Sequence, residues 1–352
     1  MFTVTGVVVR LFHQKQARIA EEWRASGEVN LKAGHAQEAI EGFRNALLYS
    51  PESALLQLEL AKALAEQGRT EEAQNYLLSL RARNPEDANV NLELARIASR
   101  RGDAGAATKY YHDAMYGQWP NNAHDRRLAA RSELIEYFLK IGRKDSARAE
   151  ALSMAVENPA DPDVRVRAGD YLLSAGDAAN AFTEFERAQR LEPGNLPALR
   201  GAGKAAILMG NFSQAEKFLA EAIRKGAKDA EAAKERDLAA AAAELDPFAA
   251  NLGDSERRRR VLRIFRAAEE RVKACMPGTF AIAPATVPDN LRNLAAERAA
   301  LPKDLNLVDL TRHAELESKA LDWALEAEKL ALLQCGPGGV TEQAIALIAA
   351  KH

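Results

Sequence analysis

The chain has 352 residues, of which 47% are hydrophobic and 28% are charged, a composition that argues against intrinsic disorder. Its 48 lysines and arginines are balanced by 50 acidic residues, so no positive excess favours nucleic acid, and no nucleic-acid partner is expected. The length predicts either two domains or one elongated repeat array.

Alanine is frequent in the chain, and β-branched residues are sparse. Runs such as DLAAAAAEL favour helix, because alanine loses no side-chain entropy when it becomes helical. No run of alternating strand residues follows Val9. The sequence therefore predicts an all-α fold.

Residues 1–19 are predicted to be an N-terminal apolar and basic leader. An apolar stretch from Phe2 to Val9 precedes Arg10, Lys15 and Arg18. It is too short to span a bilayer, which takes about 20 residues, and it lacks the basic start and cleavage site of a signal peptide. One interpretation is an ordered or frayed leader. The other is the end of a membrane helix that starts upstream, which predicts membrane association through the N-terminus.

Residues 20–229 are predicted to form six helical repeats. Glycine recurs in steps of 34, 34, 40, 34 and 34 residues, at Gly34, Gly68, Gly102, Gly142, Gly176 and Gly210. Five residues after each glycine comes an alanine, at Ala39, Ala73, Ala107, Ala147, Ala181 and Ala215. Seventeen residues after the glycine comes a proline, at Pro51, Pro85, Pro159 and Pro193. In the third copy the proline comes one residue later, at Pro120.

Each repeat is predicted to be a helix, a glycine turn, a second helix and a proline turn. Glycine supplies the left-handed residue that ends the first helix, and proline ends the second. The alanine lies one turn into the second helix, where a small side chain lets the paired helices approach closely. This pattern resembles the tetratricopeptide repeat family. The first copy matches it closely, with Trp23, Gly27, Gly34, Ala39, Phe43, Ala46 and Pro51.

The resemblance implies an α-α superhelix in which the first helix of each repeat lines a concave groove for a peptide or a partner helix. Carried over by register, the polar groove candidates are Arg24, Glu28, Lys62, Asn89, Arg96, Arg100, Glu136, Lys140, Asp170, Arg200 and Lys204. The apolar candidates are Leu31, Leu58, Leu92, Val166 and Leu173. Apolar surface would give affinity, and charges of both signs would orient the partner.

The step of 40 residues carries the segment MYGQWPNNAHDRR. Its six extra residues are predicted to lengthen the helices at this junction or to form a longer loop. Two interpretations remain. Either the insertion is neutral, or the array bends there or binds something there.

Residues 230–352 are predicted to be a helical cap that covers the apolar end of the array. A helix is expected to start with Ser255 as its N-cap, and further helices are expected over residues 290–300, 306–334 and 341–350. Cys275 and Cys335 each end a helical stretch before a proline–glycine turn. They are either two unrelated buried thiols or one disulfide between two helix ends, which would imply an oxidising compartment.

No catalytic or metal-binding motif is present in the sequence, so neither an enzyme, a cofactor nor a small-molecule substrate is expected. The sequence GAGK at Gly201–Lys204 lacks the strand and the spacing of a phosphate loop. Arg257–Arg260 form either a solvated helix face or a contact for anionic lipid or nucleic acid. A pocket around His313 and Glu315 would instead indicate an enzyme in the last third of the chain.

The sequence thus predicts a bacterial, non-enzymatic scaffold that binds a protein or is a subunit of a larger complex. A membrane-associated or periplasmic location is favoured by the N-terminus and the cysteines. The alternative is a cytosolic regulatory adaptor with two reduced thiols.

Overall fold

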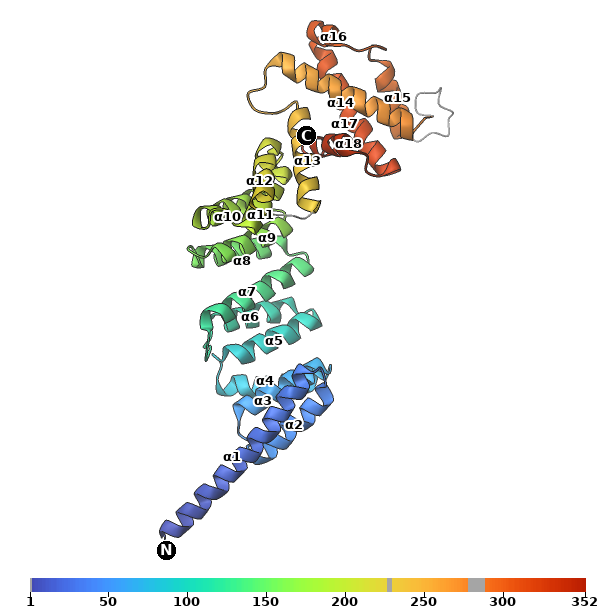
Figure 1. Cartoon of the computed structure of the whole chain (residues 1–352). Helices are drawn as coiled ribbons and strands as arrows, with labels where there is room; N and C mark the ends of the chain where they lie inside the picture. Colours follow the sequence, from blue (N-terminus) through green and yellow to red (C-terminus); the bar gives the residue numbers. More distant parts are fainter. Residues whose placement is uncertain (1, 227–229, 278–288) are drawn as a thin grey trace. The chain divides into compact units, whose positions relative to one another are not determined.

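The computed structural model describes residues 2–226, 230–277 and 289–352, with burial of side chains described from Val9 onward. Eighteen helices and no strand occur in this part of the chain (Figure 1). The chain divides into two compact units, residues 1–150 and 151–352. The all-α prediction is therefore confirmed for the described residues.

Unit 1 consists of helices that pair in sequence order, and its boundary with unit 2 falls within α8. The helices are α1 (Phe2–Lys32), α2 (Ala36–Tyr49), α3 (Ala54–Glu66), α4 (Thr70–Arg83), α5 (Ala88–Arg101), α6 (Ala104–Tyr116), α7 (Ala123–Lys140) and α8 (Lys144–Glu157). The predicted boundary at residue 19 lies inside α1, because the leader and the first repeat helix are continuous.

Unit 2 continues the repeats and adds a C-terminal group of helices. After α8 come α9 (Pro162–Ser174), α10 (Ala178–Leu191), α11 (Leu196–Met209), α12 (Phe212–Lys225) and α13 (Ala230–Leu245). The last helices are α14 (Asp254–Cys275), α15 (Asp289–Ala299), α16 (Leu307–Arg312), α17 (Ala314–Cys335) and α18 (Val340–Ala349). Phe212 of α12 shares one buried core with residues of α14, α17 and α18. Helices α14–α18 are called the cap below, although their role as a cover for the repeats stays a prediction.

The glycine and alanine positions of the repeats have the predicted roles. All six glycines are left-handed, with φ between 75° and 83°, and all six alanines are fully buried. Each second helix up to α10 also ends shortly before its proline. The periodic residues therefore build the helix pairs, because glycine alone adopts a positive φ without a steric cost.

Two predicted details of the C-terminal helices are wrong. The helix expected over residues 306–334 is two helices, because the backbone of His313 is not helical (φ −129°, ψ 89°) and separates α16 from α17. The expected N-cap Ser255 lies inside α14, whose N-cap is Gly253. The start of the first of the two helices agrees with the prediction, because a capping box between Asn306 and Asp309 begins α16 there.

Candidate functional site

All predicted groove residues lie on the first helices of the repeats, on α1, α3, α5 and α7 in unit 1 and on α9 and α11 in unit 2. They differ in exposure. Leu58 and Leu92 are buried, with 8% and 9% exposed, so they belong to the packed interior. Leu31, Val166 and Leu173 are half-buried, and Arg100, Glu136, Lys140 and Asp170 are exposed. The exposed positions are thus mainly polar.

In unit 1, an ion-pair network joins the first two of these helices. Arg24 of α1 pairs with Glu21 at 2.5 Å and also with Glu28, and its guanidinium lies 3.6 Å from Glu59 of α3. Burial raises the pKa of Glu59 to about 7; the nearby Glu28 carboxyl adds to the rise, whereas Arg24 and Lys62 oppose it. The charges of Glu28, Arg24 and Lys62 therefore all act on Glu59, which was not among the predicted groove residues.

The same arrangement recurs between α5 and α7. Arg96 donates two hydrogen bonds to Glu133, at 2.9 and 2.6 Å, and a third to Glu93 at 2.8 Å. Asn89 accepts a hydrogen bond from Arg126 at 2.8 Å. A bidentate arginine–carboxylate pair fixes both side chains in geometry as well as in charge. The two predicted residues Asn89 and Arg96 thus connect consecutive first helices.

In unit 2, predicted residues of α11 pair with α13. Lys204 lies 3.3 Å from Glu235, and Arg200 lies 3.5 Å from Glu231. Lys204 also interacts electrostatically with Asp170 of α9. Because first helices of successive repeats are joined in this way in both units, their polar residues share one face within each unit.

We expect the stability of unit 1 to depend on the protonation of Glu59. Its pKa in the folded chain, about 7, exceeds the ordinary 4.5, so the folded state holds a proton that the unfolded state releases. The free energy of unfolding should therefore fall as the pH rises from about 4.5 to about 7. Glu59→Gln should remove this part of the pH dependence, as measured by urea denaturation at pH 5 and pH 8.

Glu66→Gln is the matched control for Glu59→Gln, because Glu66 is exposed on the same helix. This control should keep the wild-type difference between the two pH values. The same pH dependence in wild type and Glu59→Gln would contradict the role given to Glu59.

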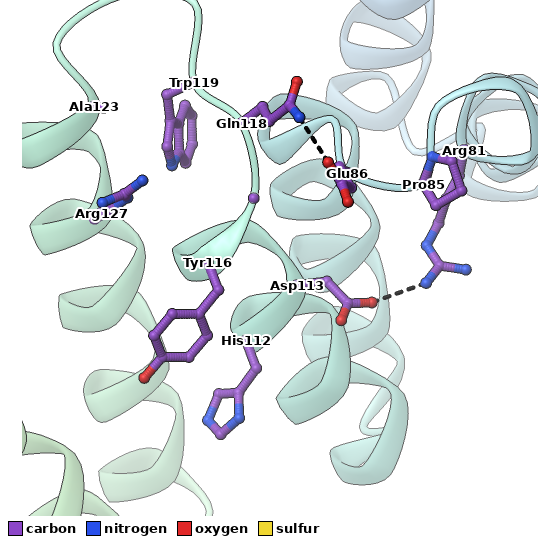
Figure 2. Close-up of a pocket in the computed structure, with 11 residues that line it drawn as sticks. Arg81, Pro85, Glu86, His112, Asp113, Tyr116, Gln118, Trp119, Ala123 and Arg127 are labelled. Carbon is purple, nitrogen blue, oxygen red and sulfur yellow. Dashed lines mark hydrogen bonds and ion pairs between the residues drawn. The ribbon is translucent and has the colours of Figure 1, made fainter.

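The insertion in the third repeat forms a pocket of about 840 Å³ in unit 1 (Figure 2). It is lined by Arg81, Pro85, Glu86, His112, Asp113, Tyr116, Gly117, Gln118, Trp119, Ala123 and Arg127. The helix α7 has 18 residues where α5 has 14. The loop at 117–122 is two residues longer than the loop at 84–87. The inserted residues therefore lengthen both the helix and the loop.

Backbone contacts fix the loop at one edge of this pocket. The amide N–H of Gln118 donates to the carbonyl of Glu86 at 2.7 Å, and the amide of Ala88 donates to the carbonyl of Gln118 at 3.2 Å. A Cβ at Gly117 would lie 2.7 Å from the carbonyl oxygen of Glu86 and 2.6 Å from that of Asp113. Only glycine therefore fits at position 117, and the loop is held against the preceding repeat.

Ion pairs and one aromatic contact organise the walls of the pocket. Arg81 donates to Asp113 at 2.8 Å, and the side chain of Gln118 donates to Glu86 at 2.6 Å (Figure 2). His112 lies 3.1 Å from Glu150 and packs edge-on against Tyr116. None of the predicted groove residues lines this pocket. The 40-residue step between two repeat glycines was the one sequence signal that pointed to it.

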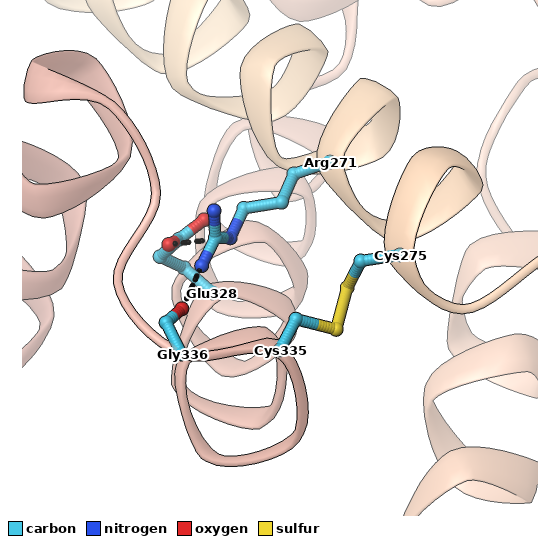
Figure 3. The surroundings of a disulfide bond; sticks show 5 residues. All are labelled: Arg271, Cys275, Glu328, Cys335 and Gly336. Carbon is cyan, nitrogen blue, oxygen red and sulfur yellow. Dashed lines mark hydrogen bonds and ion pairs between the residues drawn. A yellow bond between two sulfur atoms is a disulfide. The ribbon is translucent and has the colours of Figure 1, made fainter.

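In the cap, a disulfide joins Cys275 at the end of α14 to Cys335 at the end of α17 (Figure 3). Their Cα atoms lie 6.1 Å apart, within the ordinary range for a disulfide. Beside it, Arg271 lies 3.0 Å from Glu328 and donates to the carbonyl of Gly336 at 2.5 Å. Burial raises the pKa of Glu328 to about 7, against the opposing charge of Arg271. The bond and the ion pair thus fasten the same two helix ends.

The arginine cluster 257–260 is paired within the chain. Arg258 lies 3.3 Å from Glu317, and Arg259 lies 3.1 Å from Glu256. Arg260 donates to the carbonyls of Ala243 and Asp246, and Arg257 donates to that of Pro247. These contacts favour the interpretation of a structured, solvated helix face over a contact for anionic lipid or nucleic acid.

The remaining sequence features have structural explanations. Gly201 and Gly203 lie inside α11, where a Cβ would overlap Phe185 and Leu219, so GAGK is part of a packed helix. His313 and Glu315 lie 3.7 Å apart and are more than half exposed, which is typical of surface residues. Among the described residues, no cluster of side chains suits a metal ion. None of the described helices is long and apolar enough to cross a bilayer.

A family model agrees with the helix pairs. Residues 30–97 and 172–246 match the family model of the tetratricopeptide repeat. No match was found among curated proteins. One similar solved structure is the C-terminal part of a TPR repeat-containing protein from Cytophaga hutchinsonii, with a TM-score of 0.47 and 16% identity over 68% of this chain and 93% of that chain.

Two further solved structures are similar. Pseudomonas aeruginosa pilF has a TM-score of 0.42 and 15% identity over 62% of this chain and 97% of that chain. YrrB, described as a TPR protein with an unusual peptide-binding site, has a TM-score of 0.40 and 18% identity over 55% of this chain and 97% of that chain.

Proposed function

Because this chain is a tetratricopeptide repeat protein, we propose that it is a non-enzymatic scaffold that binds a peptide or helix of another protein. In each unit the binding surface is the face formed by the first helices of that unit's own repeats. In this proposal the glycines, alanines and prolines build the helix pairs, and specificity lies in the polar residues of the first helices.

The observation that carries the proposal is the chain of contacts along this face. In unit 1, Arg24–Glu59 and Arg96–Glu133 each join successive first helices. In unit 2, Lys204 of α11 interacts with Asp170 of the preceding first helix, α9. Pre-positioned charges of both signs suit the recognition of a partner, because complementary charges fix its orientation and register. Two cations on the face, Arg100 and Lys140, are exposed and precede the turn glycines Gly102 and Gly142 at the same register. They are available to a partner.

Reversing these two charges tests the proposal. We expect Arg100→Glu combined with Lys140→Glu to lower the recovery of bound protein at least tenfold, which corresponds to about 1.4 kcal/mol in binding free energy. The measurement is affinity purification at native expression level, followed by quantitative mass spectrometry of the proteins that co-purify.

The matched control is Lys109→Glu combined with Lys144→Glu, which reverses two exposed charges on the second helices α6 and α8. It should recover the same proteins as the wild-type chain. Recovery of no partner by the wild type, or equal recovery by both pairs of variants, would contradict a role of the first-helix face.

We further propose that the scaffold is part of a membrane-associated complex in an oxidising compartment such as the periplasm. The disulfide supports an oxidising compartment, since disulfides persist where thiols are not kept reduced. The exposed Val9, Leu11 and Phe12 beside Arg10 support a membrane contact at the start of α1. A cytosolic adaptor is the alternative, and the thiol state of Cys275 and Cys335 in natively purified protein distinguishes the two.

A further inference from the structure

The pocket at the insertion holds two hydrogen-bond donors that no group of the described chain uses. The indole N–H of Trp119 is shielded from solvent and has no hydrogen-bond partner. Arg127, at the start of α7, is exposed, and none of the described acidic residues lies within ion-pair distance of it. A buried donor without an acceptor destabilises the protein, because it has lost its hydrogen bonds to water. An acceptor that enters the pocket would therefore be stabilised there.

The acceptors in the pocket wall, by contrast, are already engaged. Glu86 accepts from the side chain of Gln118, and Asp113 accepts from Arg81 (Figure 2). Arg126 adds a further positive charge at the rim, because its guanidinium stacks 5.5 Å from the centre of the Trp119 ring. Arg81 neutralises Asp113, and Arg126 and Arg127 together outweigh the single charge of Glu86. The remaining charge at the pocket is thus positive, which suits an anionic ligand.

Aromatic surface lies beside these donors. Tyr116 at the end of α6 is 71% exposed, and the ring of Trp119 forms the neighbouring wall. A pocket of about 840 Å³ is in the range that holds a ligand of several groups rather than one small ion. The ligand should therefore carry an apolar group next to its negative charge.

We propose that this pocket binds an acidic peptide segment, separately from the face formed by the first helices. A glutamate or aspartate carboxylate accepts from Arg127 and from the indole N–H of Trp119. An adjacent apolar side chain packs against Tyr116. The backbone contacts of Gly117 and Gln118 hold the loop in place beforehand, so little ordering is needed when the peptide binds.

Fluorescence anisotropy with a labelled, terminally blocked hexapeptide of alternating glutamate and leucine tests the proposal. The full chain should bind this peptide, and the corresponding glutamine–leucine peptide should bind at least tenfold more weakly. Arg127→Ala should weaken binding of the glutamate peptide at least tenfold. Trp119→Phe, which keeps an aromatic ring but removes the N–H, should weaken it about three- to tenfold.

Two controls separate the pocket from other cationic surfaces. Arg143→Ala removes an exposed arginine beyond the other end of α7, and it should bind the glutamate peptide as the wild type does. The pair Arg100→Glu and Lys140→Glu should also keep this binding, even where it loses a partner of the first-helix face. Circular dichroism checks that each variant is folded.

Three results would overturn the proposal. The first is no binding of the glutamate peptide by the wild-type chain up to 1 mM. The second is equal binding by Arg127→Ala, and the third is equal binding of the glutamine peptide. Loss of the peptide in the first-helix pair alone, with Arg127→Ala unaffected, would assign the acidic peptide to that face instead.

Discussion

Replacing Phe185 with alanine should lower the free energy of unfolding of unit 2 by about 3–5 kcal/mol, the usual cost of removing a fully buried aromatic side chain. Phe185 of α10 is completely buried. A Cβ at Gly169 of α9 would lie 2.7 Å from its ring, and a Cβ at Gly201 of α11 would overlap the ring. One aromatic ring thus fills the space between three helices, and the two glycines leave the room that it occupies.

The loss of stability should be greatest in the helices around the ring of Phe185. Amide hydrogen exchange of α9, α10 and α11 should speed up in Phe185→Ala, and urea denaturation gives the overall change in stability. Leu208→Ala on α11 is the control, because Leu208 is 49% exposed and should cost far less. Gly201→Ala should destabilise by about 1–3 kcal/mol through overpacking. If Phe185→Ala behaved like Leu208→Ala, the ring would not be the element that joins the helices.

Removing the disulfide should cost the cap about 4 kcal/mol, because the bond closes a loop with a sequence separation of 60 residues. Cys275→Ser combined with Cys335→Ser, or the wild type with a reductant, should show this loss in urea denaturation. Hydrogen exchange should speed up at the ends of α14 and α17. Arg271 and Glu328 hold the same ends, so the helices should remain paired at a lower stability.

The control for this result is the double serine variant in the presence of reductant, which should not change further. An equal stability of oxidised and reduced wild type would show that the bond contributes nothing to the cap. Alkylation of natively purified protein without reductant, followed by mass spectrometry, should find no free thiol at either cysteine. Free thiols would remove the support for an oxidising compartment.

The repeat pattern was predictable because local backbone requirements determine it. A left-handed residue after each first helix requires glycine, and a close helix pair requires a small residue, so Gly68 and Ala73 report the fold wherever they recur. Those requirements involve neighbours in sequence or in the same hairpin. Because these requirements are local, the sequence alone is enough to predict the repeats.

The pocket and the ion pairs were not predictable in this way. Arg96 and Glu133 are 37 residues apart and belong to different repeats. Glu59 does not occupy a repeat position that predicts a groove residue, as Lys62 does. It nevertheless contacts Arg24 of the neighbouring first helix. Long, flexible charged side chains do not reveal their partners through sequence spacing. The break at His313 was missed because its neighbours on both sides favour helix.

The continuity of α1 has a mechanical consequence. Among its described side chains, which start at Val9, Ala20 is the first that is buried. A helix rises about 1.5 Å per residue, so the stretch from Phe2 to Ala20 is a rod of about 27 Å. The second half of the same rod is the first helix of the first repeat. Any group attached to the N-terminal end of α1 is therefore set at a fixed distance from the first repeat, and a pull or a twist applied there reaches Arg24 and Glu28 directly.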